Sequence, residues 1–492
     1  LRQLLTESVV LSAAGGAAGV LLALGITRAL IVLMPQDYLP NEARITINAQ
    51  VLAFSAAISV LTGILFGLAP AIRSSRPDLV DALKEAGRAA GNNAGWRIRS
   101  ALVVVEIALS VILLMGAGLT IRGFQKLLTV DPGFRADRLM LMGFQLSPRR
   151  YSTYGDRTRF DERLEQALAS IPGVQAVAIG NGGLPYGGGR SRFSIEGQAK
   201  DDSRLISLNL VSSGYRQTLG IALRAGRDLS TQEIERAEPV ALVNEAAARL
   251  WASGHNPIGS RIHVNSLEKP GLPAAPSLTP LVTIVGVIAD TRNDGLRNPA
   301  MPAVFVPYTV IATPGRTFAI RTQAPPLQFV NAVRQRVREI DPLQPLGSPI
   351  TLKDALGFQT EQPRFNMALF GFFGFVGLAL AAAGIYSMLS YTVARRTQEI
   401  GIRMALGAVR GDVLGLMLRM AGRLVLIGLV AGLAGSIFLV GFLRSEVFLV
   451  PGTDPVAIMG AICVLAAVSA IACLVPAARA ARLDPMSALR HE

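Results

Sequence analysis

Six apolar segments, each long enough to cross a lipid bilayer, dominate the hydropathy pattern of this 492-residue chain. A membrane-spanning helix needs about 20 mainly apolar residues. The segments that reach this length are 9–33, 49–69, 101–121, 367–391, 413–443 and 456–475. One such segment could be a buried core helix of a soluble protein. Six of them in one chain predict a multi-pass α-helical membrane protein.

The composition and the charge distribution agree with this prediction. Charged residues make up only 17% of the chain, whereas a soluble domain usually carries about 25%. The formal net charge is +14, and thirteen basic residues lie in the short segments 71–100, 392–412 and 477–492. Short loops rich in Lys and Arg remain in the cytoplasm. We therefore expect these segments and both chain ends there, segment 122–365 outside, and no nucleic-acid partner.

The long segment between the third and fourth spans reads as a mixed α+β domain. Its first part predicts a strand at 139–146, a helix at 158–170 and a strand at 174–179, and its last part predicts a strand at 317–322 and a helix at 327–340. These similar halves, 139–210 and 315–350, predict a ferredoxin-like, porter-like layer of sheet and helix. Between them, 211–314 reads as an inserted lobe with strands near 240–243, 282–288 and 304–307.

An internal repeat indicates how the membrane part is organised. Segments 68–83 and 474–489 share eight identical residues at a constant offset of 406, among them Pro70 and Pro476. Upstream, Gly15 matches Gly428 and Gly19 matches Gly432 at an offset of 413. We interpret 1–70 as the last two transmembrane helices of a first module, 71–100 as a cytoplasmic linker and 101–492 as a complete second module. The chain is thus expected to start inside the first copy.

The sequence offers no catalytic or metal-binding motif. A phosphate-binding loop needs a Gly-Lys-Ser/Thr sequence, and none of the five lysines follows a glycine. Three histidines and two cysteines form no cluster with the spacing of metal ligands. We therefore expect no enzymatic activity, no cofactor and no metal in this chain, and place ATP hydrolysis on a separate subunit.

One acidic residue stands inside a predicted span. Glu106 lies about 9 Å from the cytoplasmic start of segment 101–121 at 1.5 Å per residue. A carboxylate within a membrane is a functional hypothesis by default. The alternative is structural, because Glu106 could pair with a basic residue at the cytoplasmic end of the helices, such as Arg403 or Arg419. The sequence favours the structural interpretation about two to one and leaves both open.

The stretch 394–410 follows the fourth span directly on its cytoplasmic side. Its apolar residues predict a short amphipathic helix, with Glu399 and Arg403 one turn apart and Gly407 at its end. A charged stop-transfer anchor would explain the neighbouring Arg395 and Arg396. It would not explain an apolar face with two glycines, which suits close docking on a partner.

Residues 399–408 resemble the coupling-helix signature of the MacB/FtsX-type permeases of ABC transporters. The resemblance covers nearly the whole chain, because span 101–121, an outer domain introduced by Val-Asp-Pro-Gly-Phe at 130–134 and three closing spans follow the family's four-span plan. Segments 215–230, 241–246, 257–260 and 285–287 are similar to the family's periplasmic domain. The duplicated module is similar to the tandem permeases of acidobacteria, which makes the chain an N-terminally truncated member.

The resemblance implies a permease subunit in the bacterial cytoplasmic (inner) membrane, with a periplasmic domain at 122–365, three transmembrane helices within 366–476, a coupling helix at 395–410 and a cytoplasmic tail at 477–492. A separate cytoplasmic ATPase would drive export of a drug, peptide or lipoprotein. The alternative is a signalling subunit that regulates an envelope enzyme. Membrane lipids, a periplasmic adaptor, an outer-membrane channel and a dimer or pseudo-dimer are further implied partners. The residues implied to contact the ATPase are Glu399, Gly401, Arg403, Ala405 and Gly407.

Overall fold

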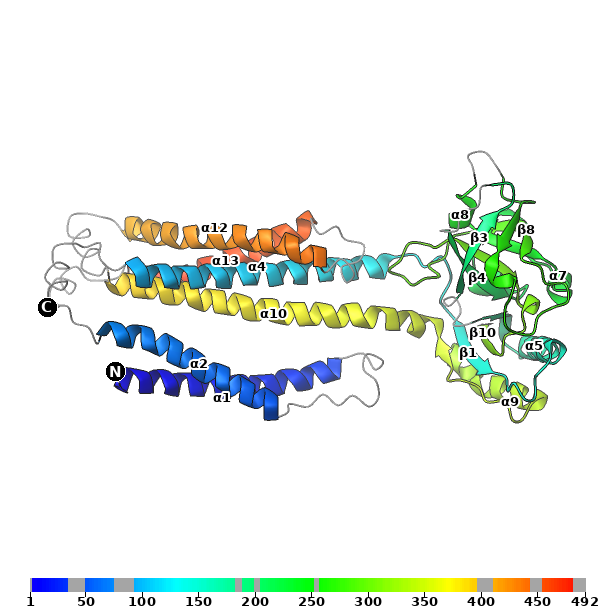
Figure 1. Ribbon diagram of the computed structural model, residues 1–492, viewed down its shortest axis with the longest axis horizontal. Helices are drawn as coiled ribbons and strands as arrows, with labels where there is room; N and C mark the ends of the chain where they lie inside the picture. Colours follow the sequence, from blue (N-terminus) through cyan, green and yellow to red (C-terminus); the bar gives the residue numbers. More distant parts are fainter. Residues whose placement is uncertain are drawn as a thin grey trace. The chain divides into compact units, whose positions relative to one another are not determined.

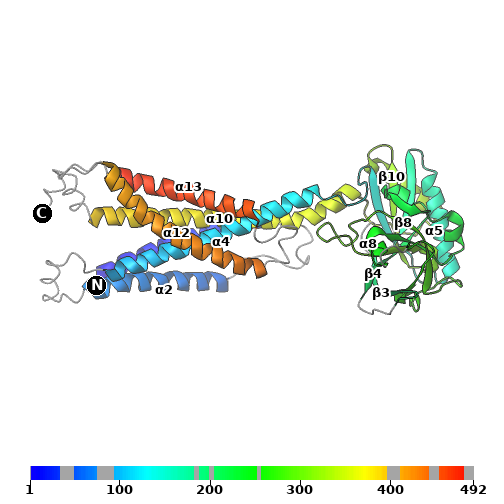
Figure 2. The ribbon, with the colours of Figure 1, turned by 90° about the horizontal axis from the view of Figure 1, so that it is seen from above.

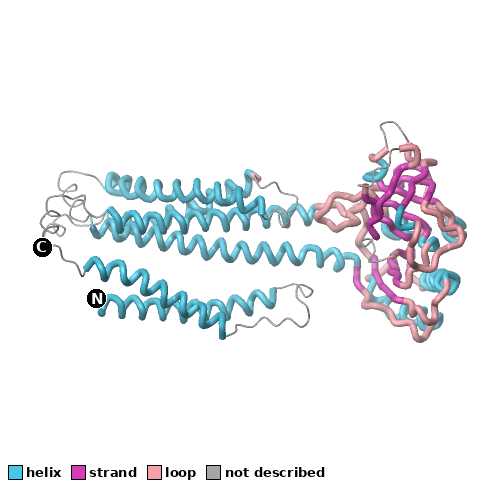
Figure 3. The backbone as a smooth tube through the Cα atoms, viewed as in Figure 1, coloured by secondary structure: helices cyan, strands magenta, loops and turns pink. Residues whose placement is uncertain are grey.

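The computed structural model describes residues 2–33, 49–74, 93–181, 188–198, 204–251, 256–395, 410–442 and 454–480. The chain divides into two compact units. A helical unit combines Leu1–Phe124 with Glu361–Glu492, and Gln125–Thr360 forms the second unit. All described strands belong to the second unit, as the magenta segments of Figure 3 show.

The helical unit contains long apolar helices (Figure 1). They are α1 (Arg2–Leu33), α2 (Ala49–Ser74), α4 (Asn93–Thr129), α10 (Leu352–Arg395), α12 (Arg410–Phe442) and α13 (Pro455–Ala480). Five candidate spans are confirmed by length and composition: Val9–Ala29, Arg99–Thr129, Leu352–Ala394, Leu414–Phe438 and Pro455–Pro476. The other predicted span, 49–69, falls on α2, where the apolar part within the described residues is the shorter Ala49–Thr62.

Two helix pairs in this unit correspond to the two copies of the sequence repeat. Helices α2 and α13 both have 26 residues, and both their first and last residues are separated by the repeat offset of 406. In the first pair, α1 contacts α2, with Gly16 of α1 beside the Ser59 side chain. In the second pair, α12 contacts α13. The interpretation of a duplicated module rests on the sequence repeat and stays a prediction.

Helix α4 supplies much of the buried surface of the second copy. Its residues Val103, Ile107, Val111 and Met115 recur every four positions, which places them on one face, and all four are buried. They form a cluster with apolar residues from α10, α12 and α13. Figure 2 shows α12 crossing α4. The period of the apolar positions thus fixes which face of α4 its neighbours cover.

The second unit begins with a four-stranded antiparallel sheet in the order β11-β1-β10-β2. Its elements are β1 (Leu139–Gln145), α5 (Tyr154–Ala169), β2 (Val174–Gly180), β10 (Gly315–Thr322), α9 (Val330–Ile340) and β11 (Ile350–Thr351). Helix α5 packs on β2 and on α9. Two strand–helix–strand halves interleaved in this order form a ferredoxin-like sheet, as the sequence predicts.

The chain between β2 and β10 forms a closed ring of six strands. The strands pair in the order β4-β3-β7-β8-β6-β9, and β9 pairs with β4 to close the ring. They are β3 (Gly189–Ile195), β4 (Leu205–Val211), β6 (Val240–Asn244), β7 (Arg261–Val264), β8 (Leu281–Ile288) and β9 (Ala303–Pro307). The lobe expected at 211–314 therefore begins too late, because the ring also includes β3 and β4, which start at Gly189 and Leu205.

The elements that complete the second unit are short. They are α6 (Tyr215–Leu219), β5 (Leu223–Gly226), α7 (Thr231–Glu235), α8 (Glu245–Ala248) and the 3-10 helices Asn265–Leu267, Tyr308–Val310 and Pro326–Phe329. One hydrophobic core extends from the ferredoxin-like sheet into the ring, with Leu164, Ile179, Phe305 and Ile320 among its buried members. This shared core explains why the two parts form a single compact unit.

Candidate coupling site in the transmembrane helices

Glycines of α12 bring its backbone against α4. A Cβ atom added at Gly428 would lie 2.6 Å from Ile107 Cγ2, and one added at Gly432 would lie 2.6 Å from Val111 Cβ. Real Cβ atoms do not approach other carbon atoms so closely, so the observed packing requires glycine at both positions. Small residues allow transmembrane helices to pack closely in lipid, where burial of apolar groups supplies little driving force.

Small residues also allow α4 and α10 to pack closely against each other. A Cβ atom at Gly377 of α10 would lie 3.1 Å from Ser110 Oγ, and one at Gly116 of α4 would lie 3.0 Å from the Phe370 ring. The Ser110 hydroxyl donates a hydrogen bond of 2.7 Å to the Glu106 carbonyl oxygen, so it is satisfied within its own helix. Helix α4 is therefore in close contact with both α10 and α12.

Glu106 lies at the α4–α10 contact. Its Oε2 atom is buried and has no hydrogen-bond partner within the part of the chain that the structure describes. A Cβ atom at Gly384 of α10 would collide with this oxygen, so the glycine provides the space that the carboxyl group occupies. Arg419 is exposed on α12 and forms no ion pair with Glu106 among the described residues. Arg403, the other suggested partner, lies outside the described residues.

Two contacts hold the ends of α4. Near its start, the Arg99 guanidinium lies 4.2 Å from the centre of the Tyr391 ring, a cation–π contact with the last turns of α10. Near the other end, Arg122 Nε lies 3.8 Å from a carboxylate oxygen of Asp454. Asp454 also accepts a 2.9 Å hydrogen bond from the Val456 amide at the start of α13. Helix α4 thus contacts α10 at one end and α13 at the other.

The predicted coupling helix joins two of these helices. Helix α10 ends at Arg395 and α12 begins at Arg410. The residues assigned to ATPase contact, Glu399, Gly401, Arg403, Ala405 and Gly407, lie outside the described residues. Their role stays a prediction. In the sequence, the segment follows α10 and precedes α12, the two helices that pack on α4. Tyr391, which forms the contact with Arg99, lies four residues before the end of α10.

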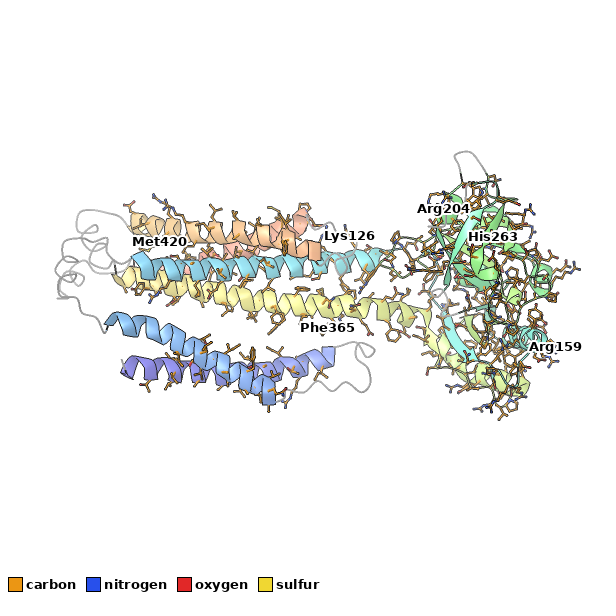
Figure 4. The ribbon with its side chains drawn as sticks, viewed as in Figure 1. Lys126, Arg159, Arg204, His263, Phe365 and Met420 are labelled. Carbon is orange, nitrogen blue, oxygen red and sulfur yellow. The ribbon has the colours of Figure 1, made fainter. Side chains whose placement is uncertain are left out.

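The side chains that could suggest other chemistry are scattered. The described residues contain no group of three or more His, Cys, Asp or Glu able to hold a metal ion. His263 of β7, which is labelled in Figure 4, lies 2.9 Å from a Glu268 oxygen. Cys473 is buried, whereas Cys463 is exposed on the same helix.

A buried ion pair connects helix and strand in the second unit. Asp161 of α5 and Arg316 of β10 are both fully buried, with 3.1 Å between Asp161 Oδ2 and Arg316 Nε. The same guanidinium donates 3.1 Å hydrogen bonds to the carbonyl oxygens of Tyr308 and Ile311. Removal of one partner from such a pair costs about 3–5 kcal/mol. No local pattern in the sequence predicts this pair, because its members stand 155 positions apart.

Burial also changes the acidity of this region. Burial raises the pKa of Glu165 from 4.5 to about 7, an effect that nearby Asp161 and Glu162 increase and a hydrogen bond from Ser212 decreases. Burial raises the pKa of Asp161 as well, although Arg316 opposes the shift. A carboxyl with a raised pKa binds its proton more tightly in the folded state. The free energy of unfolding of this unit should therefore fall as the pH rises from about 4 to 7.

The two units match the models of two known protein families. Residues 100–340 match the family model of the MacB-like periplasmic core domain, and residues 371–485 match that of the FtsX-like permease C-terminal region. The chain belongs to the MacB/FtsX-type permeases of ABC transporters. In this permease the first match covers most of α4 and of the α+β unit, and the second covers most of α10 with α12 and α13. It is a membrane protein with a large periplasmic α+β domain.

Several proteins similar to this permease are named as exporters. It is 26% identical over 366 residues to the macrolide export ATP-binding/permease protein MacB of Sodalis glossinidius, covering 69% of this chain and 52% of that protein. It is 25% identical over 437 residues to the pyoverdine export ATP-binding/permease protein PvdT of Pseudomonas aeruginosa, covering 85% and 59%. The permease chain spans about half the length of the curated relatives it matches.

A solved structure also matches the permease. The periplasmic region of MacB from Actinobacillus actinomycetemcomitans aligns over 47% of this chain and 96% of that structure, with 14% sequence identity and a TM-score of 0.32.

Proposed function

We propose that this permease is the membrane subunit of an exporter in the bacterial cytoplasmic membrane, and that a separate cytoplasmic ATPase moves its periplasmic domain. The substrate would be a drug, a peptide or a lipoprotein. A periplasmic adaptor and an outer-membrane channel would complete the path, and the duplicated module would supply a dimer or pseudo-dimer. The names of the similar proteins support the export function.

One observation carries the proposal. The boundaries between the helical unit and the periplasmic unit, at Phe124–Gln125 and Thr360–Glu361, fall inside the continuous helices α4 and α10. The chain is helical on both sides of each boundary. A displacement of the segment between α10 and α12 would therefore pass along helices into the periplasmic domain. An ATPase bound at 399–408 would be in the position to cause such a displacement.

The assignment of the coupling segment can be tested by deleting residues 399–408. The deletion should abolish co-purification of the partner ATPase, while the permease remains in the membrane. Arg419→Ala, which removes an exposed positive charge nearby on α12, is the matched control and should leave co-purification unchanged. Normal co-purification of the deletion variant would show that the ATPase docks elsewhere.

The role of Glu106 needs a separate test, because its carboxyl group is placed between α4 and α10 without a described partner. Glu106→Gln keeps the shape of the side chain and removes its charge. We expect normal assembly with the ATPase and reduced ATP-dependent extrusion of a fluorescent apolar drug from proteoliposomes. Loss of assembly in this variant would instead assign Glu106 a structural role.

A further inference from the structure

The loop that follows β8 contacts the chain segment directly after α4, where the chain enters the periplasmic unit. Residues 289–298 are called the clamp loop here. The Arg292 amide donates a 3.0 Å hydrogen bond to the Pro132 carbonyl oxygen, just after α4 ends at Thr129. A Cβ atom at Gly133 would collide with the Asp290 carbonyl oxygen, and Gly133 has a φ of +80°, which favours glycine. Only glycine allows this close approach of the two backbones.

The clamp loop also contacts the start of α10, where the chain leaves the periplasmic unit. The Leu296 amide donates a 2.8 Å hydrogen bond to Oε1 of Gln359, a residue in the first part of α10. Leu296 is buried. A Cβ atom at Gly295 would lie 3.5 Å from the same Gln359 oxygen, so the loop backbone lies directly against this side chain. One loop thus contacts both chain segments that connect the unit to the transmembrane helices.

A third set of contacts attaches the clamp loop to the ring of strands. Asp290 accepts a 2.7 Å hydrogen bond from the Ala246 amide at the start of α8 and a 2.9 Å hydrogen bond from Arg249. Asp294 accepts two hydrogen bonds from the Arg190 guanidinium of β3. Charge-assisted hydrogen bonds are among the stronger hydrogen bonds of proteins. The loop is therefore attached to two different elements of the ring.

Hydrogen bonds within the loop make it stiff. The Asn298 side chain donates to the carbonyl oxygen and the carboxylate of Asp294, at 2.8 and 3.1 Å. The Arg292 guanidinium donates to the Asn298 carbonyl oxygen, and the Gly295 amide donates to the Arg292 carbonyl oxygen. A loop bonded across its own width moves as a body, so a displacement at one attachment reaches the others.

We propose that the clamp loop is the element that transmits movements of α4 and α10 to the ring through Asp290 and Asp294. This inference rests on the proposed function, in which both helices are displaced by the ATPase. Gln359 is a positioning residue in this scheme, because it acts on the ring through the loop. When α4 and α10 move, α8 and β3, which contact the clamp loop, would be displaced before the strands that do not contact it.

Hydrogen–deuterium exchange of the full chain in lipid nanodiscs tests the transmission without any ATPase. Gln359→Leu removes the acceptor for the Leu296 amide. Exchange should become about five-fold faster at Leu296, the factor that one net hydrogen bond supplies. It should also become faster at Ala246, which does not contact Gln359. Asp290→Ala provides the reverse test, because coupling is reciprocal, and should accelerate exchange at Leu296.

Two further variants separate transmission from general destabilisation. Gln359→Glu retains an oxygen that accepts from Leu296 and should preserve the slow exchange at Ala246. Gln335→Leu on α9 removes an exposed side chain that bonds only Glu339 among the described contacts, and should change neither site. If Gln359→Leu does not fold, the rate of exchange at Leu296 in the Asp290→Ala variant decides whether the loop transmits the displacement. Faster exchange confined to the mutated end would refute the proposal, and ATPase docking at 399–408 would be unaffected by that result.

Discussion

The two helix pairs of the membrane part carry matching glycines in different surroundings. In α12, Gly428 and Gly432 touch α4, and Leu424 is 8% exposed. At the repeat offset of 413, Gly15 and Gly19 of α1 occupy the equivalent positions, yet a Cβ atom at either would meet no atom within 4 Å in the described chain. Leu11, the equivalent of Leu424, is 73% exposed.

This difference shows what a glycine pattern specifies in a membrane helix. The glycines permit a close helix contact, but only a helix with matching side chains opposite makes that contact. Helix α4 provides Ile107 and Val111 to the second pair. The sequence repeat alone predicts equal behaviour of the two pairs, whereas their different neighbours predict unequal sensitivity to substitution. Four experiments test that inequality, in order of decreasing effect.

The largest effect is expected from leucine at the covered glycine. In Gly432→Leu, the new side chain would meet Val111 and the Ala108 carbonyl oxygen. Forcing α12 from α4 should lower the free energy of unfolding by about 3 kcal/mol. Thermal unfolding of the purified chain in detergent measures this effect. Gly19→Leu is the matched change in α1 and should have almost no effect, and equal losses in both variants would contradict the comparison.

Alanine at the next pair of glycines should give effects of opposite sign. Gly428→Ala places a methyl group against Ile107 and should destabilise the protein by about 1–2 kcal/mol. Gly15→Ala meets no neighbour in the described chain, so the better helix propensity of alanine should stabilise by up to about 1 kcal/mol. The same unfolding assay distinguishes these outcomes. Destabilisation by Gly15→Ala would indicate that a helix covers α1.

The ion pair of the second copy should contribute less. Arg122→Gln removes the charge that faces Asp454 at 3.8 Å. Because the Arg122 side chain is 35% exposed, we expect a loss of at most about 1 kcal/mol. The loss should shrink at high salt, since salt screens exposed charges. A salt-independent loss in the unfolding assay would show that the residue acts through packing.

The smallest effect is expected inside the first pair. In Gly16→Ala, the new Cβ atom would lie 3.1 Å from Ser59 Oγ, which is the movable end of a side chain. The Ser59 hydroxyl could rotate away, although it now donates to the Ser55 carbonyl oxygen. We expect a change below about 0.5 kcal/mol in the free energy of unfolding. A larger loss would show that the α1–α2 contact is as tightly packed as that of α12 with α4.

The sequence predicted those features that depend on local pattern. Apolar runs identified five of the spans, and alternation with turn residues located β1, β2, β8, β9 and β10 within one or two residues. The order of the ferredoxin-like sheet also followed, because two similar strand–helix–strand halves have few ways to share one sheet. These features are set by residues close together in the chain.

Features that depend on pairing of residues far apart in the chain could not be predicted from the sequence. The ring needs the parallel pairing of β4 with β9, about a hundred residues later, and nothing in either strand specifies that partner. The space that Gly384 provides for Glu106 was missed for the same reason. Glu106 itself was recognised because a carboxylate is rare in an apolar span. The described structure places no ion pair there, where the sequence favoured one.

The closure of the ring has an evolutionary consequence. Strands β4 and β2 share a single residue pair, Gly180 with Val211, whereas β4 and β9 share five. The ring therefore pairs its own strand edges and shares only this one residue pair with the strands of the sheet into which it is inserted, although the two parts share a hydrophobic core. A domain that enters and leaves a host at neighbouring points can be lengthened, replaced or lost while the host sheet keeps its pairing. Diversification of relatives should accordingly concentrate in the ring.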